Sequence, residues 1–377
     1  MSDKPIYADL VPGRVVLRQG DCLAGLRRLP DACIDSIVTD PPYGLSENPP
    51  PIADVLRAWL AGDDYAHRGG GFKKNSWDAL VPGPPIWKEA LRVLKPGGHL
   101  VAFSAARTAY ALTTAIAIAG FEIRNTLAWI HADGGGAYNH AIDQRFEKLL
   151  TTGRSSRAPG VKPEGKVWMK DTGGKVAVTQ PEALAWRGWG TGLKPAQEPI
   201  LLARKPMIGS YVPNLRAYRT GALNIDGCRV DDGTIARHPA NVVHDGSAEA
   251  LYGFSGDKAG FFFCPKPRGD DRAGSGHDTI KPVDLMRWLC RLVTPPGGVV
   301  LDPFAGSGTT GVALAEEGFY GMLIERETRY CEDIVKRFAK PPPSIAQAIE
   351  AKPRKARKAR PPAVTGTEHL QGDLFSA

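Results

Sequence analysis

Apolar and polar positions follow a regular order toward both ends of the chain. Residues 14–40 predict strand, helix, strand: VVLRQGD alternates, CLAGLRRLP repeats apolar residues at helical spacing, and IDSIVTD is a short apolar run. Residues 84–130 continue with helix, a KPGG turn, strand, helix and strand. Residues 282–338 add an amphipathic helix, strand, Gly-rich loop, helix, strand and helix. This alternation predicts an α/β fold with a mostly parallel sheet.

Three stretches lack this periodicity. Residues 45–80 read as a long loop rich in Gly, Pro and basic residues, and residues 131–193 and 206–276 are irregular. A strand-like EPILLARK lies between the last two. From residue 340 the chain is rich in Pro, Ala, Lys and Arg, a composition typical of a disordered tail.

The composition excludes several classes of protein. The 377 residues are 42% hydrophobic, which fits a globular core, but contain no apolar run of about 18 residues. The first residues, MSDKPIYADL, lack the apolar core of a signal peptide. Six cysteines are scattered without metal-ligand spacing. We therefore expect a cytoplasmic protein with no membrane span, no disulfide framework and no metal site.

The distribution of charge suggests a polyanionic partner. The net charge is +8, residues 151–205 hold ten Lys or Arg against four Asp or Glu, and residues 351–360 hold six more without an acid. Nucleic acid is the obvious candidate, and a basic surface that only confers solubility is the alternative.

One strand is expected to end in an unusual way. IVTDPPYG presents the carboxylate of Asp40, then Pro41 and Pro42, then the ring of Tyr43. Proline lacks an N–H and fixes φ, so the strand stops there, and Gly44 lets the chain turn. The result is a stiff platform at the carboxyl end of a strand, where open α/β sheets bind ligands.

A second strand leads into a glycine loop. VLDPFAGSGTTG contains a literal G-x-G-x-x-G, and Glu325 ends the next strand. This pattern is typical of dinucleotide sites, so an NAD-dependent oxidoreductase is one reading. Asp302, however, stands where a pyrophosphate would bring negative charge. An acid there suits S-adenosylmethionine, which carries an ammonium, a sulfonium and a ribose but no phosphate.

Taken together, DPPYG and DPFAGSGTTG resemble the DNA amino-methyltransferases, which methylate adenine N6 or cytosine N4 with S-adenosylmethionine. The motif order is similar to the beta group of that family. GDC at 20–22, KPAQEP at 194–199 and HDTIKP at 277–282 also match, with Asp278 in place of the usual proline. TGALNIDGCRV and ARHPANVVHDG resemble phage and prophage members in particular. The resemblance therefore implies a bacterial or phage-encoded protein that associates with the nucleoid.

The resemblance implies a Rossmann-like S-adenosylmethionine-dependent methyltransferase fold, permuted so that the catalytic half precedes the cofactor half, with an inserted target-recognition segment. The expected order is a catalytic half at 1–130, a basic insertion at 131–193, a returning core strand at 194–205, a target-recognition segment at 206–276, a cofactor-binding half at 277–339 and a disordered basic tail at 340–377.

It also implies roles for individual residues. The catalytic candidates are Asp40, Pro41, Pro42 and Tyr43, of which Asp40 and the Pro41 carbonyl accept the amino hydrogens and Tyr43 stacks on the base. We expect Asp302 to face the cofactor ammonium, directly or through water, and Glu325 to hold the ribose hydroxyls. His277, Thr279 and Lys281 are expected near the methionine carboxylate. The full set of cofactor candidates is Asp21, Cys22, His277, Thr279, Lys281, Asp302, Phe304, Gly306, Ser307, Gly308, Thr309 and Glu325.

The expected partner is double-stranded DNA, from which the target base must flip to reach the platform. Backbone contacts are expected from Lys73, Lys74, Arg354, Lys355, Arg357 and Lys358. Beta-group relatives are often homodimers. The terminal Gln371–Phe375 resembles the motif by which bacterial proteins dock on the replication sliding clamp, and a chance Leu-Phe pair is the alternative.

Asp at the first position of DPPY favours adenine, because N4-cytosine members more often carry Ser there. N4-cytosine methylation and, more remotely, an NAD-dependent oxidoreductase remain alternatives. So do a methyltransferase acting on RNA or protein, and an inactive DNA-binding relative. The sequence does not reveal the DNA target, or whether a restriction enzyme accompanies the protein in a restriction-modification pair.

Overall fold

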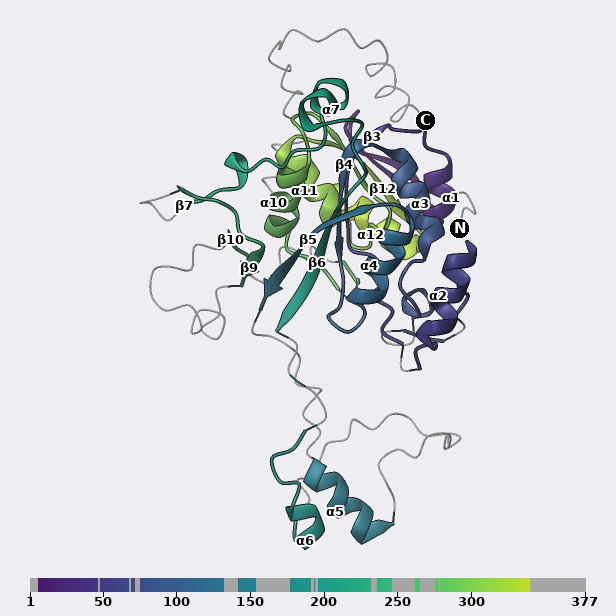
Figure 1. Ribbon diagram of the computed structural model, residues 1–377, viewed down its shortest axis with the longest axis vertical. Coiled ribbons are helices and arrows are strands. Elements are labelled where there is room, and N and C mark those ends of the chain that lie inside the picture. The colour runs from purple at the N-terminus through teal and green to yellow at the C-terminus, as the bar shows by residue number, and fades with distance from the viewer. Residues whose placement is uncertain are drawn as a thin grey trace. The chain divides into compact units, whose positions relative to one another are not determined.

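The computed structural model describes residues 6–46, 48–67, 69–71, 75–131, 142–153, 177–190, 193, 196–231, 236–245, 262–264, 275–277 and 279–339. Their main feature is a sheet with the strand order β1-β2-β12-β11-β3-β4-β6-β5-β9-β10 (Figure 1). Its strands are β1 (Tyr7–Val11), β2 (Val15–Gln19), β12 (Tyr320–Glu325), β11 (Val299–Asp302), β3 (Ile34–Thr39), β4 (Leu94–Phe103), β6 (Gln197–Arg204), β5 (Glu122–Ile130), β9 (Val242–His244) and β10 (Phe262–Phe263). Only β1 and β6 run antiparallel to their described neighbours, which confirms the mostly parallel α/β prediction.

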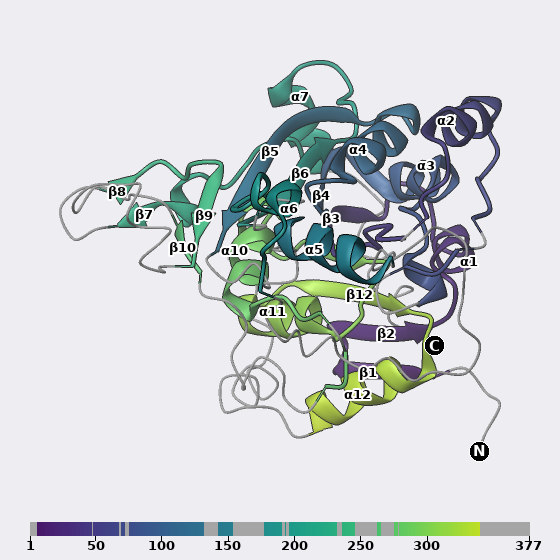
Figure 2. The ribbon, with the colours of Figure 1, turned by 90° about the horizontal axis from the view of Figure 1, so that it is seen from below.

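Helices cover both faces of this sheet (Figure 2). One face carries α1 (Cys22–Arg27), α2 (Ile52–Ala61), α3 (Pro84–Val93) and α4 (Ala109–Ile118); the other carries α10 (Val283–Val293), α11 (Thr309–Glu317) and α12 (Thr328–Ala339). Because side chains of a strand alternate between faces, Val15 and Leu17 enter one apolar cluster and Val16 the other. The sheet is therefore buried on both sides, as parallel sheets require.

Several elements were not expected from the sequence. The predicted loop at 45–80 contains α2 and a short 3-10 helix at Ser76–Asp78. Helix α2 buries Val55 and Trp59 and ends at Gly62, whose φ of +91° is left-handed. The apolar spacing of IADVLRAWLA, bounded by Pro and Gly, was the available signal. The antiparallel edge strand β1 was also missed.

The predicted KPGG turn lies inside β4. Ile34 pairs with Leu94 and Ser36 with His99, so the four residues between Leu94 and His99 bulge from the ladder. Gly97 has a φ of +82°, and the backbone of Gly97 and Gly98 bonds to that of Lys205. The turn residues thus interrupt the strand without ending it.

The predicted target-recognition segment at 206–276 is not wholly irregular. It contains α7 (Tyr211–Tyr218), a 3-10 turn at Asp226–Cys228 and a hairpin of β7 (Val230–Asp231) and β8 (Ala236–Arg237). Its strands β9 and β10 extend the main sheet beside β5.

Residues 133–196 form a compact unit of their own. It contains α5 (Ile142–Thr152) and α6 (Pro181–Leu184). Glu147 of α5 accepts hydrogen bonds from the backbone of Thr179 and Gln180, which tie the segment before α6 to α5. No helix among the described residues could span a membrane.

Candidate active site

The two sequence motifs meet at the carboxyl edge of the sheet. Strands β3 and β11 are parallel neighbours, and the chain continues from β3 toward β4 but from β11 toward β12, in opposite directions. Such a reversal of strand order opens a crevice outside the carboxyl ends of the two strands. Asp40 follows β3 and Asp302 ends β11, so both carboxylates reach this crevice.

A cavity of about 360 Å³ occupies the crevice. It brings together every catalytic and cofactor candidate except Gly308: Asp40, Pro41, Pro42, Tyr43, Asp21, Cys22, His277, Thr279, Lys281, Asp302, Phe304, Gly306, Ser307, Thr309 and Glu325. These residues come from opposite ends of the chain, and the sheet order alone makes them neighbours.

The carboxylate of Asp40 has one paired and one unpaired oxygen. Its Oδ2 accepts a hydrogen bond from Lys281 Nζ at 2.7 Å. Its Oδ1 is buried and has no hydrogen-bond partner among the described residues. A buried acceptor without a partner is costly in a folded protein, and this one belongs to a residue that lines the cavity.

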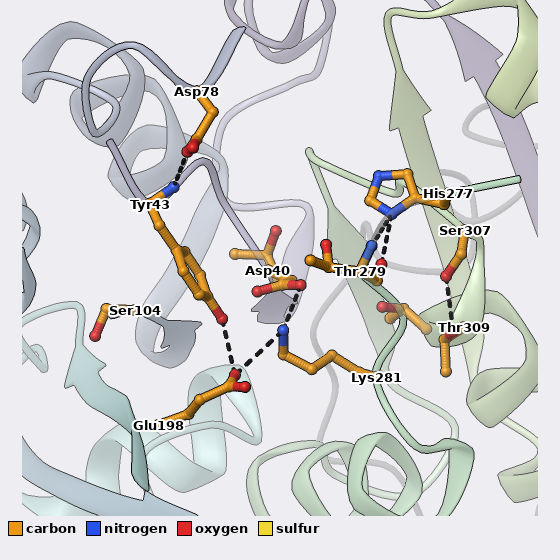
Figure 3. A network of polar contacts seen from close by, with 12 residues as sticks. Asp40, Tyr43, Asp78, Ser104, Glu198, His277, Thr279, Lys281, Ser307 and Thr309 are labelled. Atoms are coloured by element: carbon orange, nitrogen blue, oxygen red, sulfur yellow. Dashed lines mark hydrogen bonds and ion pairs between the residues drawn. The ribbon is translucent and has the colours of Figure 1, made fainter. Parts of the chain in front are cut away.

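Tyr43 stands beside Asp40 with its hydroxyl engaged. The Oη atom donates to Glu198 Oε2 at 3.0 Å, and Lys281 Nζ lies 5.2 Å from the ring centroid (Figure 3). Burial, together with the negative charges of Asp40 and Glu198, raises the pKa of Tyr43 well above its usual range. The phenol therefore remains neutral and acts as a donor.

Asp78, a residue that the sequence did not single out, holds the platform in shape. Its side chain accepts hydrogen bonds from the backbone N–H groups of Tyr43 at 2.7 Å, Gly44 at 2.9 Å and Leu45 at 3.3 Å. The residue is buried, and it lies in the short 3-10 helix near the end of the segment 45–80. An acid at the end of NSWD was the only signal, and no local pattern linked it to DPPYG.

The glycine loop is shaped by its neighbours. Gly306 has a φ of +53°, and a Cβ at this position would lie 3.1 Å from His277 Nε2. One oxygen of Glu325 accepts a hydrogen bond from the backbone N–H of Gly306, and the other accepts one from the backbone N–H of Glu327, each at 2.8 Å. Gly308 has a φ of +75° and begins α11. The buried Arg337 of α12, which no sequence motif indicated, donates to the carbonyl of Ser307.

Asp302 is a structural anchor in this arrangement. Its oxygens accept from the hydroxyls of Thr39 and Thr310 and from the backbone of Phe304. Burial raises the pKa of Asp302 to about 6, although the three hydrogen bonds act in the opposite direction. The residue ties the tip of β11 to that of β3 rather than presenting a free carboxylate.

Lys281 lines the cavity and faces two carboxylates. Its ammonium contacts Asp40 at 2.7 Å and Glu198 at 3.3 Å, and its side chain is 7% exposed. The neighbouring His277 is held through Nδ1 by the backbone of Thr279, and its ring packs against Tyr330. The HDTIKP segment thus contributes His277, Thr279 and Lys281 to the lining of the cavity.

The remaining cofactor candidates line the cavity and make local contacts. Asp21 caps α1 by accepting from the backbone of Ala24. Burial raises the pKa of the Cys22 thiol to about 12, so it is neutral. Ser307 and Thr309 hydrogen-bond to each other at 2.9 Å. The DNA-contact candidates Lys73, Lys74, Arg354, Lys355, Arg357 and Lys358 and the Gln371–Phe375 peptide lie outside the described residues.

Comparison with known proteins decides the family. The profile of the DNA methylase family, which covers N6 and N4 amino-methyltransferases, matches residues 34–336. The chain belongs to this family. Type II methyltransferase M.HindIII of Haemophilus influenzae is 26% identical over 337 residues, which are 81% of this chain and 93% of that protein.

Two solved structures, one described as a putative DNA modification methylase and the other as a DNA methyltransferase, are also similar to this one. TTHA0409 of Thermus thermophilus, complexed with S-adenosyl-L-methionine, has 20% identity and a TM-score of 0.43 over 88% of this chain and 96% of its own. PvuII DNA methyltransferase, described as cytosine-N4-specific, has 14% identity and a TM-score of 0.48 over 97% of both chains. Family membership confirms the DNA amino-methyltransferase prediction and S-adenosylmethionine as the cofactor.

Proposed function

We propose that this DNA methyltransferase modifies the exocyclic N6 of adenine in double-stranded DNA, at a specific site, after flipping the base out of the duplex. The observation that carries the proposal is the buried, unpaired Oδ1 of Asp40 at the end of β3. An oxygen in that position can accept a hydrogen bond from a ligand, and the amino group of a nucleobase is a suitable donor.

The chemistry of the amino group explains why an acceptor is useful. The nitrogen lone pair of adenine N6 is delocalised into the ring, so the nitrogen is a poor nucleophile. Asp40 accepts one N–H, the Pro41 carbonyl accepts the other, and the nitrogen becomes more pyramidal with its lone pair directed at the methyl group. Positive charge develops on nitrogen in the transition state, where fixed acceptors contribute most. Rigid prolines and the Asp78 bonds hold these acceptors in place.

The cavity residues fit the cofactor, which supplies an electrophilic methyl group when bound. Gly306 leaves backbone open where a Cβ would meet His277. Glu325 uses each oxygen for one backbone N–H, and a carboxylate has about four lone-pair sites, so it can accept ribose hydroxyls as well. Asp21 and Cys22 line the same cavity from the start of α1.

The choice of adenine over cytosine rests on the first residue of DPPY. A carboxylate at this position gives a charged acceptor, whereas N4-cytosine members more often carry Ser there. Charge-assisted hydrogen bonds are roughly twice as strong as neutral ones. Asp40 therefore favours the N6-adenine branch of the family.

Sequencing of DNA from cells that express the protein tests the proposal, if the method distinguishes N6-methyladenine from N4-methylcytosine. We expect N6-methyladenine within one recurring sequence in cells that express the wild-type protein. Asp40→Ala and the near-isosteric Asp40→Asn should remove it while S-adenosylmethionine still binds. N4-methylcytosine in place of N6-methyladenine would establish the alternative, and unmodified DNA with the wild-type protein would contradict both.

A further inference from the structure

A cluster of charged side chains contacts the paired oxygen of Asp40 (Figure 3). Lys281 Nζ is 2.7 Å from Asp40 Oδ2 and 3.3 Å from Glu198 Oε2. The same Glu198 oxygen accepts the Tyr43 hydroxyl at 3.0 Å. Lys281 comes from the HDTIKP segment and Glu198 from β6, so two distant parts of the chain meet behind the catalytic motif.

The charges in this cluster are stable. Burial alone would lower the pKa of Lys281, but Asp40 and Glu198 raise it above its ordinary value. Burial would also raise the pKa of Glu198, yet the charge of Lys281, the imidazole of His131 at 3.7 Å and the hydrogen bond from Tyr43 lower it to about 2. Two carboxylates therefore face one ammonium, which suits a site where positive charge develops on the target nitrogen.

Glu198 determines the direction in which the N–H groups of the Lys281 ammonium point. An ammonium has three N–H donors and no acceptor. Here one is directed to Oδ2 of Asp40 and another lies toward Glu198. Without the Glu198 charge, the attraction of the ammonium to Asp40 is no longer balanced from the other side, and the second oxygen of Asp40, which is buried and has no partner among the described residues, is open to one of its N–H groups. Lys281 would then occupy the oxygen that the target amino group needs.

We propose that Glu198 is a positioning residue for methyl transfer: it holds Lys281 and Tyr43 in place and thereby keeps Asp40 Oδ1 open for the target amino group. This inference rests on the proposed function, since it assigns Glu198 a part in the same step. Glu198 does not line the cavity, so it acts through Lys281 and Tyr43 rather than on the substrate.

Glu198→Gln is the informative variant, because Gln can still accept from the Tyr43 hydroxyl but carries no charge for Lys281. The assay is single-turnover transfer from isotope-labelled S-adenosylmethionine to DNA prepared from a bacterium that lacks its own methyltransferases, with enzyme in excess. We expect the transfer rate to fall about 10- to 100-fold, the loss of one charge-assisted interaction. S-adenosylmethionine should bind within about twofold of the wild-type affinity, which also shows that the variant is folded.

A double-variant comparison separates positioning from a merely structural role. If Glu198 acts through Lys281, Glu198→Gln should add little to the loss caused by Lys281→Met, so the two effects are not additive. The matched control is Glu122→Gln on β5, which loses a carboxylate paired to Arg204 at 2.6 Å and should transfer at the wild-type rate.

Wild-type transfer rates in Glu198→Gln would overturn the inference and leave the proposed function standing. Additive losses, or a loss confined to cofactor binding, would also overturn it. Absence of any transfer by the wild-type protein is a different result, because it removes the proposed function and the inference together.

Discussion

Replacement of Asp302 by Asn should change how stability depends on pH. Burial raises the pKa of this carboxyl from an ordinary value of 3.8 to about 6. A raised carboxyl pKa means that the folded state binds more protons than the unfolded state between these two values. The contribution of Asp302 to the free energy of unfolding is therefore fully present below pH 3.8 and is lost as the pH rises through 6.

The size of the effect follows from the pKa difference. The interval from 3.8 to about 6 corresponds to about 3 kcal/mol, and about 2 kcal/mol of it falls between pH 4.5 and 7.5. Asn is neutral throughout and can still hydrogen-bond to Thr39 and Thr310. The stability of Asp302→Asn relative to wild type should thus improve by about 2 kcal/mol across that range.

Urea unfolding at several pH values measures this difference directly, because other titrating groups cancel between the two proteins. Asp54→Asn on α2 is a matched control for the loss of an exposed carboxylate, which pairs with the exposed Arg57, and the effect specific to burial is the difference between the two variants. A pH-independent difference for Asp302→Asn, or one of opposite sign, would refute the assignment of Asp302 as a buried anchor.

The same variant tests whether Asp302 contacts the cofactor ammonium, as the sequence suggested. Its two oxygens accept three hydrogen bonds, from Thr39, Thr310 and the backbone of Phe304, and the residue is only 2% exposed, so little of the carboxylate is accessible to a ligand. We therefore expect calorimetry at pH 7.5 to show S-adenosylmethionine affinity within a few-fold of wild type. Loss of a direct charge-assisted contact would instead weaken binding by about 1.5–3 kcal/mol, or roughly 10- to 150-fold.

Other parts of the site and the basic tail lead to further expectations. Gly306→Ala should weaken S-adenosylmethionine binding at least about 10-fold in calorimetry, because its φ is +53° and the new Cβ would contact His277. Gly62→Ala should leave binding unchanged, since Gly62 is also left-handed but no atom lies within 4 Å of its Cβ position. Asp78→Ala should cost about 2–4 kcal/mol in urea unfolding and slow methyl transfer, because three backbone N–H groups lose their acceptor; a cost below about 1 kcal/mol would contradict this. Affinity for non-target DNA should fall less steeply with salt, without a change of methylated sequence, after Ala substitution at Arg354, Lys355, Arg357 and Lys358.

The sequence by itself determined the family, the fold class and most of the elements that carry the site. Strand periodicity and the two motifs are local properties, so β3, β11, β12 and the glycine loop were predicted close to their observed bounds. Prolines and glycines define the local conformation of DPPYG and of the glycine loop. The backbone angles that proline and glycine allow do not depend on tertiary context. The helix α2 was missed because the Gly- and Pro-rich residues around it masked its apolar spacing.

Only the tertiary structure decided which hydrogen-bond and ion-pair partners the side chains of the site have. Asp302 and Asp40 are both acids at strand ends, and the sequence cannot show that Asp302 is engaged by Thr39 and Thr310 while Asp40 keeps one oxygen free. The role of Asp78 and the pairing of Lys281 with Glu198 likewise depend on contacts between segments far apart in the chain. Hydrogen-bond partners and burial are set by the sheet order, which places β3 beside β11 and β6 beside β4, and no local pattern encodes that order.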